Sequence, residues 1–357
     1  MSISVIGGCE LSESHIGRWR EIQSMHPYYT SPYFCPEFTL SVASVRRDVY
    51  IAILKEKNET IGFFPFQNRY GFGCPVGSYM NDLHGLIIKP DVHFDFNEVL
   101  HATRLASWDF HHLVDYNFYS DRYILKSDIS HYMDLSEGFN GYIKDIKDRG
   151  SGIFKEYKKK IRMIEREVGP LRFIPNSSDS NILNKLINWK SRQYRITGLV
   201  DIFKQTWTCN LLEKILDCKG DSFAGMLSVL MAGNNILAIH MGMRSNLACN
   251  LWFLRHNLEY SRYSPGMVLR MLIAEHASSL NMLRVDVGCG GSETHKPRIC
   301  TGGIPVAFGS VEIRTPLTIG RKLLQNVADY ARKSALRPIY NAPAKLLADK
   351  LRRMNYR

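Results

Sequence analysis

Apolar and polar positions along the first third of the chain follow the pattern of a mixed α/β fold. The apolar spacing of residues 11–23 predicts a short helix that begins after Ser12. Two apolar runs at 49–55 and 60–67 are separated by the polar turn EKNE, which predicts a β-hairpin. The glycine-rich sequence YGFGCPVGSYMNDLHG that follows predicts a loop, and HATRLASWDF predicts part of a helix.

Helical periodicity dominates the middle of the chain. Residues 139–147 and 154–168 predict two helices, which Gly150-Ser151-Gly152 separates. The second helix is strongly basic between Lys155 and Arg166 and ends at Gly169-Pro170. A strand at LRFIP and helices at 181–194 and 206–218 are predicted next.

Three apolar runs then follow with short connections. They cover residues 223–231, 236–243 and 247–254, and their tight turns predict an antiparallel meander. An amphipathic helix at 267–280 and a strand at 283–287 complete the pattern.

The last strand runs into the sequence VDVGCGGSE at 285–293, which has the look of a nucleotide-binding loop. In an S-adenosylmethionine-dependent methyltransferase, such a loop follows the first strand of a doubly wound sheet and opens directly into a helix. Here about 70 residues remain, and SETHKPRICTGGIP contains two prolines and two further glycines. The methyltransferase alternative is therefore disfavoured.

A better phosphate-binding element precedes that strand. Ser264 suits the N-cap of the helix and Pro265 suits its first position, while Gly266 permits close approach to the backbone. A helix N-terminus offers free N–H groups and the positive end of the helix dipole, which favour a pyrophosphate. An ordinary capped helix is the alternative interpretation.

Composition and charge limit the class of protein. The 357 residues are 45% hydrophobic and 22% charged, which is globular composition and leaves room for two domains. No run of eighteen apolar residues and no secretory signal pattern is found. The eight scattered cysteines, without a C-x-x-C pair, predict reduced thiols and no metal site. The formal charge of +12 favours a polyanionic partner such as a phosphate-bearing cofactor, an anionic lipid surface or nucleic acid.

The order meander, loop, helix, strand resembles the core of the GNAT acyltransferase superfamily. More narrowly, YSRYSPGMVLRMLIAEHASSLNMLRVDVGCGGSETHK resembles the two-domain, FemAB-like branch of the CelD/BcsL type, associated with bacterial cellulose and exopolysaccharide synthesis. The matching positions are Tyr260, Tyr263, Ser264, Pro265, Gly266, Arg284, Asp286, Gly290, Glu293 and Lys296. Asn281-Met282 stands where the family has glycine-leucine, and His295 stands where it has an aromatic residue.

The N-terminal half resembles the same family more loosely, at SPYF, PEF and IGFFPF. The resemblance implies an α/β fold with mixed, mainly antiparallel central sheets and two tandem GNAT-like domains. We expect an N-terminal GNAT-like domain at 1–134, a C-terminal GNAT domain with the acyl-CoA site at 135–318, and a basic helical tail at 319–357.

The implied function is transfer of an acyl group, most often acetyl from acetyl-CoA, to the nitrogen or oxygen of a sugar in bacterial cell-surface polysaccharide synthesis. We expect a cytoplasmic protein without a metal, which contacts an anionic membrane or a synthase complex at the inner face of the plasma membrane. FemAB relatives use aminoacyl-tRNA, so a tRNA-dependent transferase is one alternative, although tRNA is the less favoured partner and DNA is not expected. A non-catalytic scaffold of a membrane-associated polysaccharide synthase complex is another.

The resemblance also implies which residues meet the substrates. The cofactor-binding set would comprise Trp252, Phe253, Leu254, Tyr263, Ser264, Pro265, Gly266 and Met267. His240, on a predicted strand, and Asp286, at the end of another, are the candidates for catalysis, because acyl transfer needs a base near the acceptor. Glu293 and Lys296 would bind the acceptor. Structural roles remain open for all four, as an Asx turn does for Asp286.

Overall fold

The strands form one continuous, mainly antiparallel sheet. The computed structural model describes residues 1–90, 92–114, 121–289, 296–316, 318–321 and 323. Within them the strand order is β1-β2-β3-β4-β6-β14-β7-β13-β11-β10-β9-β8, while β5 pairs with β3 and β12 pairs with β10. This arrangement confirms the mixed α/β class.

The N-terminal half of the sheet contains β1 (Ser2–Gly7), β2 (Val49–Glu56), β3 (Glu59–Arg69), β4 (Phe72–Cys74), β5 (Ile87–Ile88) and β6 (Ser107–Val114). The other half contains β7 (Ile124–Asp134), β8 (Leu171–Ile174), β9 (Phe223–Ala232), β10 (Asn235–Ser245), β11 (Ala248–Asn250), β12 (Phe253–His256) and β13 (Arg284–Gly288).

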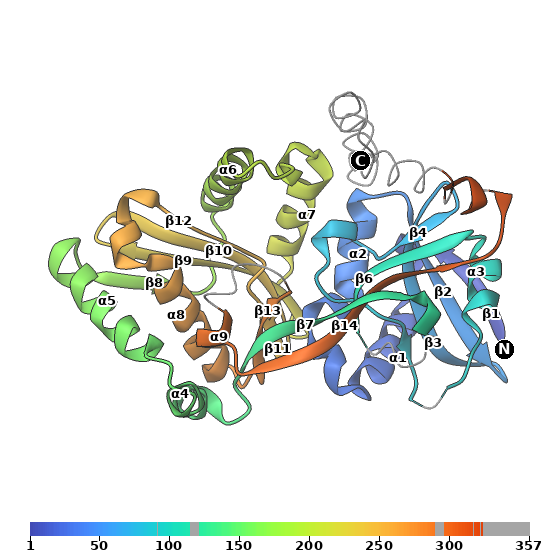
Figure 1. Cartoon of the computed structure of the whole chain (residues 1–357), viewed down its shortest axis with the longest axis horizontal. Coiled ribbons are helices and arrows are strands. Elements are labelled where there is room, and N and C mark those ends of the chain that lie inside the picture. The colour runs from blue at the N-terminus through green and yellow to red at the C-terminus, as the bar shows by residue number, and fades with distance from the viewer. Residues whose placement is uncertain (91, 115–120, 290–295, 317, 322, 324–357) are drawn as a thin grey trace, which may run out of the picture.

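The final strand, β14 (Gly302–Glu312), joins the two halves. It pairs antiparallel with β6 on one side, from Val306–Val114 to Glu312–Ser107, and with β7 on the other. In Figure 1 the orange-red β14 accordingly lies between the blue-green strands β6 and β7. The predicted second domain therefore supplies a strand that is inserted beside the last strand of the first.

Helices cover both faces of the sheet. The N-terminal half contains α1 (Glu13–Ser24), α2 (Pro36–Val45) and α3 (Phe96–Thr103). The C-terminal half contains α4 (Gly138–Asp148), α5 (Ile153–Glu167), α6 (Ser180–Ile196), α7 (Thr206–Asp217), α8 (Pro265–Ser279) and α9 (Lys296–Ile299). One apolar core includes Trp19 and Phe63 with Leu211 and Phe253, so burial of apolar surface also holds the two halves together.

The predicted start of α1 and the predicted β-hairpin are confirmed, because both depend on residues close together in the sequence. Helix α1 follows Ser12, whose Oγ accepts a hydrogen bond from the His15 amide at 3.3 Å. The predicted hairpin forms β2 and β3, and its turn residues Lys57 and Asn58 have φ of 47° and 68°.

Three predictions need correction. The sequence HATRLASWDF is helical only to Thr103, where α3 ends, and its last four residues begin β6. The run at 70–85 is not only loop, because β4 and a 3-10 turn at Ser78–Met80 form within it. The predicted strand at 247–254 is interrupted at Leu251-Trp252 and forms β11 and β12 separately. Strand β11 pairs with both β10 and β13, whereas β12 pairs with β10, and this change of partner breaks the strand.

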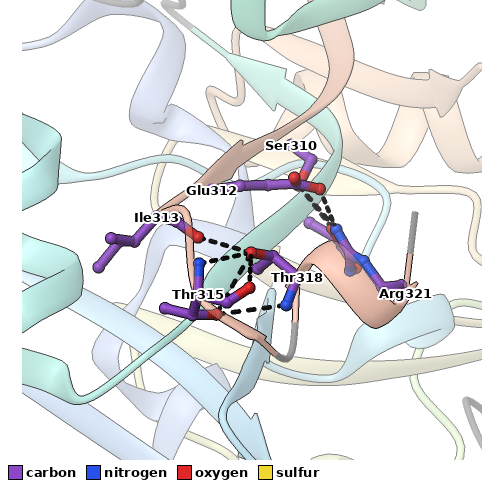
Figure 2. Close-up of polar contacts among 7 residues, drawn as sticks. Ser310, Glu312, Ile313, Thr315, Thr318 and Arg321 are labelled. Atoms are coloured by element: carbon purple, nitrogen blue, oxygen red, sulfur yellow. Dashed lines mark hydrogen bonds and ion pairs between the residues drawn. The ribbon is translucent and has the colours of Figure 1, made fainter. Parts of the chain in front are cut away.

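The segment after β14 is fixed to the sheet by polar contacts (Figure 2). The Thr318 hydroxyl donates to the Ile313 carbonyl oxygen at 2.7 Å and accepts from the Thr315 amide at 2.9 Å. Arg321 pairs with Glu312 of β14 and with Asp109 of β6, the latter at 2.7 Å. The predicted basic tail therefore begins against the N-terminal half, and most of it lies outside the described residues.

No helix in the described part of the chain is both long enough and apolar enough to cross a bilayer.

Candidate active site

A separation between two parallel strands defines the candidate site. Strands β11 and β13 pair in parallel at Ala248–Arg284, Cys249–Val285 and Asn250–Asp286. The Leu251 amide then donates to the Asp286 carbonyl oxygen at 2.8 Å. Beyond this bond β12 continues along β10, while β13 pairs with β7 on its other side. The edge of β12 that faces the separation therefore offers backbone groups to a ligand.

Helix α8 begins beside this edge. Ser264 occupies the N-cap position and Pro265 the first helical position, as the sequence predicts. Ser264, however, has φ of 50° and its side chain makes no capping hydrogen bond. The amides of Met267 and Val268 donate to the Ser264 carbonyl oxygen at 3.0 and 3.2 Å. Gly266 is therefore the best-placed amide for an anion, and no acidic residue occupies the first turn.

The glycine at 266 keeps the approach to β12 open. A Cβ atom there would lie 3.2 Å from Leu254 Cδ2 and 3.6 Å from His256 Nδ1. Tyr263, just before the helix, is buried, and its hydroxyl donates to Glu167 of α5 at 3.1 Å. This bond fixes the segment that leads into the helix. Lys160 of α5 donates to the Arg262 carbonyl oxygen and brings a cation to the same place.

Cations gather around β12 without matching acids. Burial, together with the nearby guanidiniums of Arg255 and Arg270, lowers the pKa of Lys190 to about 8. The pKa of His256 is lowered by burial and by the same two arginines. No carboxylate pairs with Lys190, Arg255 or Arg270 in the described part of the chain. Mutually repelling, partly buried cations are a costly arrangement that an anionic ligand would relieve.

Aromatic side chains line the approach from β12. The Trp252 ring lies edge-on to Tyr33 at 6.1 Å, and Phe253 lies edge-on to Phe203 at 5.2 Å. Lys190 Nζ is 5.9 Å from the centre of the Phe253 ring. Trp252 and Phe253, two of the residues predicted to bind the cofactor, therefore make aromatic contacts at the start of β12.

His240 is fully buried in β10. Its Nε2 donates to the Asn250 carbonyl oxygen at 3.0 Å, which places the proton on that nitrogen because a carbonyl only accepts. Burial lowers its pKa to about 4. This geometry suits a residue that holds the start of the strand separation in place better than one that meets an acceptor.

A small polar hollow lies at the other end of the separation. It is lined by Tyr33, Asp82, Leu83, Ser130, Asn250, Leu251, Asp286, Val287 and Gly288. Tyr33 and Asp82 come from the N-terminal half, and the Tyr33 hydroxyl donates to Asp82 Oδ2 at 3.4 Å. The hollow therefore brings the two halves of the chain to one place.

The two carboxylates of the hollow have different environments. Asp286 Oδ1 lies 2.8 Å from Arg284 Nε, and Asp286 Oδ2 is buried without a hydrogen-bond partner among the described residues. Burial raises the pKa of Asp82 to about 6, and Asp286 contributes in the same direction. A carboxyl group with a pKa near neutrality is suited to proton transfer.

Lys296 approaches the same hollow from α9. Its ammonium donates to the Gly288 carbonyl oxygen, and its charge opposes the rise in the pKa of Asp82. Burial lowers the pKa of Lys296 itself. Glu293, its predicted partner in acceptor binding, lies outside the described residues. No cluster of three or more metal-ligating side chains is found in the described ranges.

Comparison with known proteins gives this arrangement a family context. Residues 152–296 match the model of an "Acetyltransferase (GNAT) domain". FemX has a similar structure with a TM-score of 0.59 and 8% identity, over 90% of this chain and 100% of that chain. A tandem GNAT protein from the clavulanic acid biosynthesis pathway has a TM-score of 0.50 and 7% identity, over 87% and 98%. The chain has a tandem GNAT fold.

A further relative of this fold is the C-terminal domain of a putative lysylphosphatidylglycerol synthetase from Agrobacterium fabrum. Its TM-score is 0.54 at 11% identity, and the match covers 89% of this chain and 97% of that one. No curated protein sequence matches the chain significantly. The GNAT fold is thus shown, while the CelD/BcsL branch is not confirmed. The mainly antiparallel sheet also differs from the doubly wound parallel sheet that the methyltransferase alternative requires.

The N-terminal GNAT-like half also contains a pair of parallel strands with a hollow beside it, but among its described residues it lacks the positive charge found around β12. Strands β4 and β6 pair in parallel at Phe72–Ser107 and Gly73–Trp108, and a hollow of about 320 Å³ opens beside them. Its helix α3 begins at Asp95, whose Oδ1 accepts from the Asn97 amide at 2.9 Å, and Glu98 lies in the first turn. These acidic groups disfavour a pyrophosphate at that helix.

The sequence therefore indicated part of the site in the C-terminal GNAT domain. Asp286 and Lys296 do approach one hollow, and Gly266 does face β12. Sequence reasoning missed Tyr33, Asp82, Asn250, Lys190, Arg255 and Arg270. The only available signal was the SPYF motif for Tyr33; the others depend on contacts between distant segments.

Proposed function

We propose that the protein transfers an acyl group from acyl-CoA, with acetyl-CoA as the probe of choice, to a sugar amine or hydroxyl. The observation that carries this proposal is the cluster of Lys190 (α6), Arg255 (β12) and Arg270 (α8) around β12, which has no carboxylate partner among the described residues. It lies next to a strand edge that can receive the pantetheine amides by β-type hydrogen bonds. A thioester that carries several phosphates matches both features.

Each feature has a role in the proposed reaction. The Gly266 amide and the cations would hold the pyrophosphate, and β12 would align the thioester with the hollow. Asp82 would accept the proton of the attacking amine or hydroxyl, because its pKa of about 6 leaves it ionised at pH 7. The pKa of Tyr33 is raised well above its usual value by burial, so its hydroxyl keeps its proton; once Asp82 is protonated, that proton would turn from Asp82 to the developing oxyanion.

Only the reacting amine or hydroxyl of the acceptor would enter the hollow between the two halves, because its volume of about 10 Å³ holds one water-sized group. Asp286 offers a buried carboxylate oxygen without a hydrogen-bond partner among the described residues, and the Asn250 side chain lines the same hollow. Such groups suit the hydroxyls of a sugar, which both donate and accept hydrogen bonds. Lys296, with Glu293 from the sequence analysis, would bind its periphery. His240 is assigned a positioning role in this scheme.

Thioester turnover tests the donor. Release of free CoA from acetyl-CoA, measured with a panel of amino sugars and sugar alcohols, should depend on the purified protein. Arg255→Ala should raise KM for acetyl-CoA at least tenfold with a smaller effect on kcat, since it removes a phosphate contact. The matched control, Lys158→Ala on the exposed face of α5, should leave both constants unchanged. Absence of acetyl-CoA binding by calorimetry would contradict the proposal.

A tRNA-dependent aminoacyl transfer is the second candidate, because one observation favours it. The exposed side of α5 presents Lys155, Lys158, Lys159, Arg162 and Arg166, and α5 contacts the segment before α8. An extended polyanion would use that face, whereas CoA would not reach along it. In this case Lys158→Ala and Lys159→Ala should weaken tRNA binding, and acetyl-CoA should produce no thermal shift.

A scaffold without catalysis would show neither turnover nor loss of function in Asp82→Asn.

A further inference from the structure

A cluster of exposed aliphatic side chains marks the connection after α6. Ile196, Leu199 and Val200 are 70%, 60% and 39% exposed, although they lie within five consecutive residues. Isolated apolar residues are common on protein surfaces, but a concentration of them in one loop indicates a contact surface.

The backbone of this loop is held in place. The Leu199 amide donates to the Tyr194 carbonyl oxygen at 2.9 Å, and Gly198 has φ of 71°, as in a helix C-cap. The residue after such a glycine commonly packs against the helix, but Leu199 is 60% exposed. At the end of the loop, Ser191 donates to the buried carboxylate of Asp201 and closes the turn.

Positive charge surrounds the aliphatic residues. Residues 180–204 contain five basic residues (Lys185, Lys190, Arg192, Arg195, Lys204) and one acidic residue, Asp201. Arg192, Arg195 and Lys204 are exposed, and none of the three forms an ion pair within the described residues. The single acid is buried, so the surface that this loop presents is both apolar and cationic.

We propose that this loop docks the protein on an anionic lipid bilayer, with Ile196, Leu199 and Val200 inserted at the level of the headgroups and Arg192, Arg195 and Lys204 on the lipid phosphates. Aliphatic side chains gain free energy among acyl chains, and each basic residue near an anionic surface adds to the attraction. An RNA partner would use the cations but not the aliphatic residues, which neither stack on bases nor bind phosphates.

Docking by this loop would bring the bilayer close to the strand separation. Lys190 precedes the end of α6 by six residues, which corresponds to about 9 Å along a helix axis. An acceptor held on a lipid could then reach the hollow; this consequence rests on the proposed function, whereas the docking itself does not.

Vesicle binding tests the docking without any substrate. Cosedimentation of the full-length protein with vesicles of 70% phosphatidylcholine and 30% phosphatidylglycerol should exceed that with pure phosphatidylcholine, and 0.5 M salt should weaken it. The double variant Ile196→Ser and Leu199→Ser should bind about tenfold more weakly. The matched control, Leu125→Ser with Leu258→Ser, removes side chains that are 83% and 55% exposed elsewhere and should bind like the parent protein.

Charge is tested by a second matched pair. Arg192→Gln with Arg195→Gln should lower vesicle binding severalfold, while Lys158→Gln with Lys159→Gln, which removes the same charge from α5, should not. Equal binding by the loop variants and the parent protein, or no vesicle binding at all, overturns the proposal. Two other results would also overturn it, if vesicle binding by the serine variant equals that of the parent protein. One is that the serine variant is a monomer while the parent protein is a dimer, and the other is that the serine variant no longer binds a single-stranded RNA probe. Because no acyl donor is present, failure here leaves the proposed transfer reaction intact.

Discussion

In Asp82 and Lys190, two side chains of the proposed site, burial changes the pKa in opposite directions. Burial favours the neutral form of each, so the pKa of the carboxyl rises and that of the ammonium falls. Both changes bring proton exchange closer to neutral pH. The titration of Asp82 therefore reports on the acceptor side of the proposed site, and that of Lys190 reports on the donor side.

Replacing Asp82 by Asn should separate activity from stability. With an unfolded pKa of about 3.9 and a folded pKa of about 6, the folded protein holds the proton more tightly, so stability falls as pH rises from 4 to 6 and stays lower at pH 7. Asp82→Asn should therefore raise the free energy of unfolding at pH 7 by up to about 3 kcal/mol, because it removes the cost of ionising a carboxyl whose pKa is about 6 in the folded protein.

The same substitution should lower kcat about 100-fold or more, because it removes the proposed base. In the parent protein kcat/KM should decrease below pH 6, and that decrease should be absent from the residual activity of the variant. Denaturant titration and a pH–rate profile check both expectations. Asp217→Asn, an exposed carboxyl on α7, is the control that should change neither.

Lys190 should take up a proton when the donor binds. Its pKa of about 8 leaves it mostly neutral at pH 9, and a bound phosphate would favour the charged form. Affinity for acetyl-CoA should therefore fall as pH rises from 8 to 10. Calorimetry at pH 9 in buffers of different ionisation enthalpy measures the uptake directly, and Lys190→Gln should abolish it. An unchanged uptake in that variant would assign the proton to another group.

At the scale of single elements, the start of α8 controls access to β12. A Cβ at position 266 would meet the flexible end of Leu254 at 3.2 Å, so Gly266→Ala should fold with little loss of stability. It should nevertheless raise KM for acetyl-CoA about tenfold, because the methyl group occupies the approach to the backbone. Gly17→Ala in α1, where a Cβ meets nothing within 4 Å, is the control; it should stabilise the protein by up to about 1 kcal/mol and leave KM unchanged.

The elements also explain which features the sequence alone could indicate. The start of α8 was predictable because Ser264, Pro265 and the following apolar period act within a few residues. The break at Leu251-Trp252 was not, since it depends on β13, which is more than thirty residues further along the chain. Asp82 was assigned to a glycine-rich loop, and only its contact with Tyr33 and the C-terminal half makes it a site residue.

For the molecule as a whole, β14 determines whether the two halves can exist separately. The buried side chains of this strand are Ile304, Val306, Ala307 and Val311. Its backbone pairs with β6 on one side and with β7 on the other. A chain that ends at residue 301 should therefore lose cooperative unfolding and aggregate through the exposed edges of β6 and β7. A chain that ends at residue 323 retains β14 and the Arg321 contacts, and should melt like the full-length protein. Circular dichroism melting curves compare the two.

The insertion of β14 also affects how the protein folds during translation. A ribosome adds about 5–20 residues per second, so roughly 170 residues separate the completion of β7 from the arrival of β14, a delay on the order of ten to thirty seconds. During that time the edges of β6 and β7 that later pair with β14 have no strand beside them. The nascent chain must be shielded through this interval, and its yield in a cell should depend on chaperone capacity and on the speed of translation between these two strands.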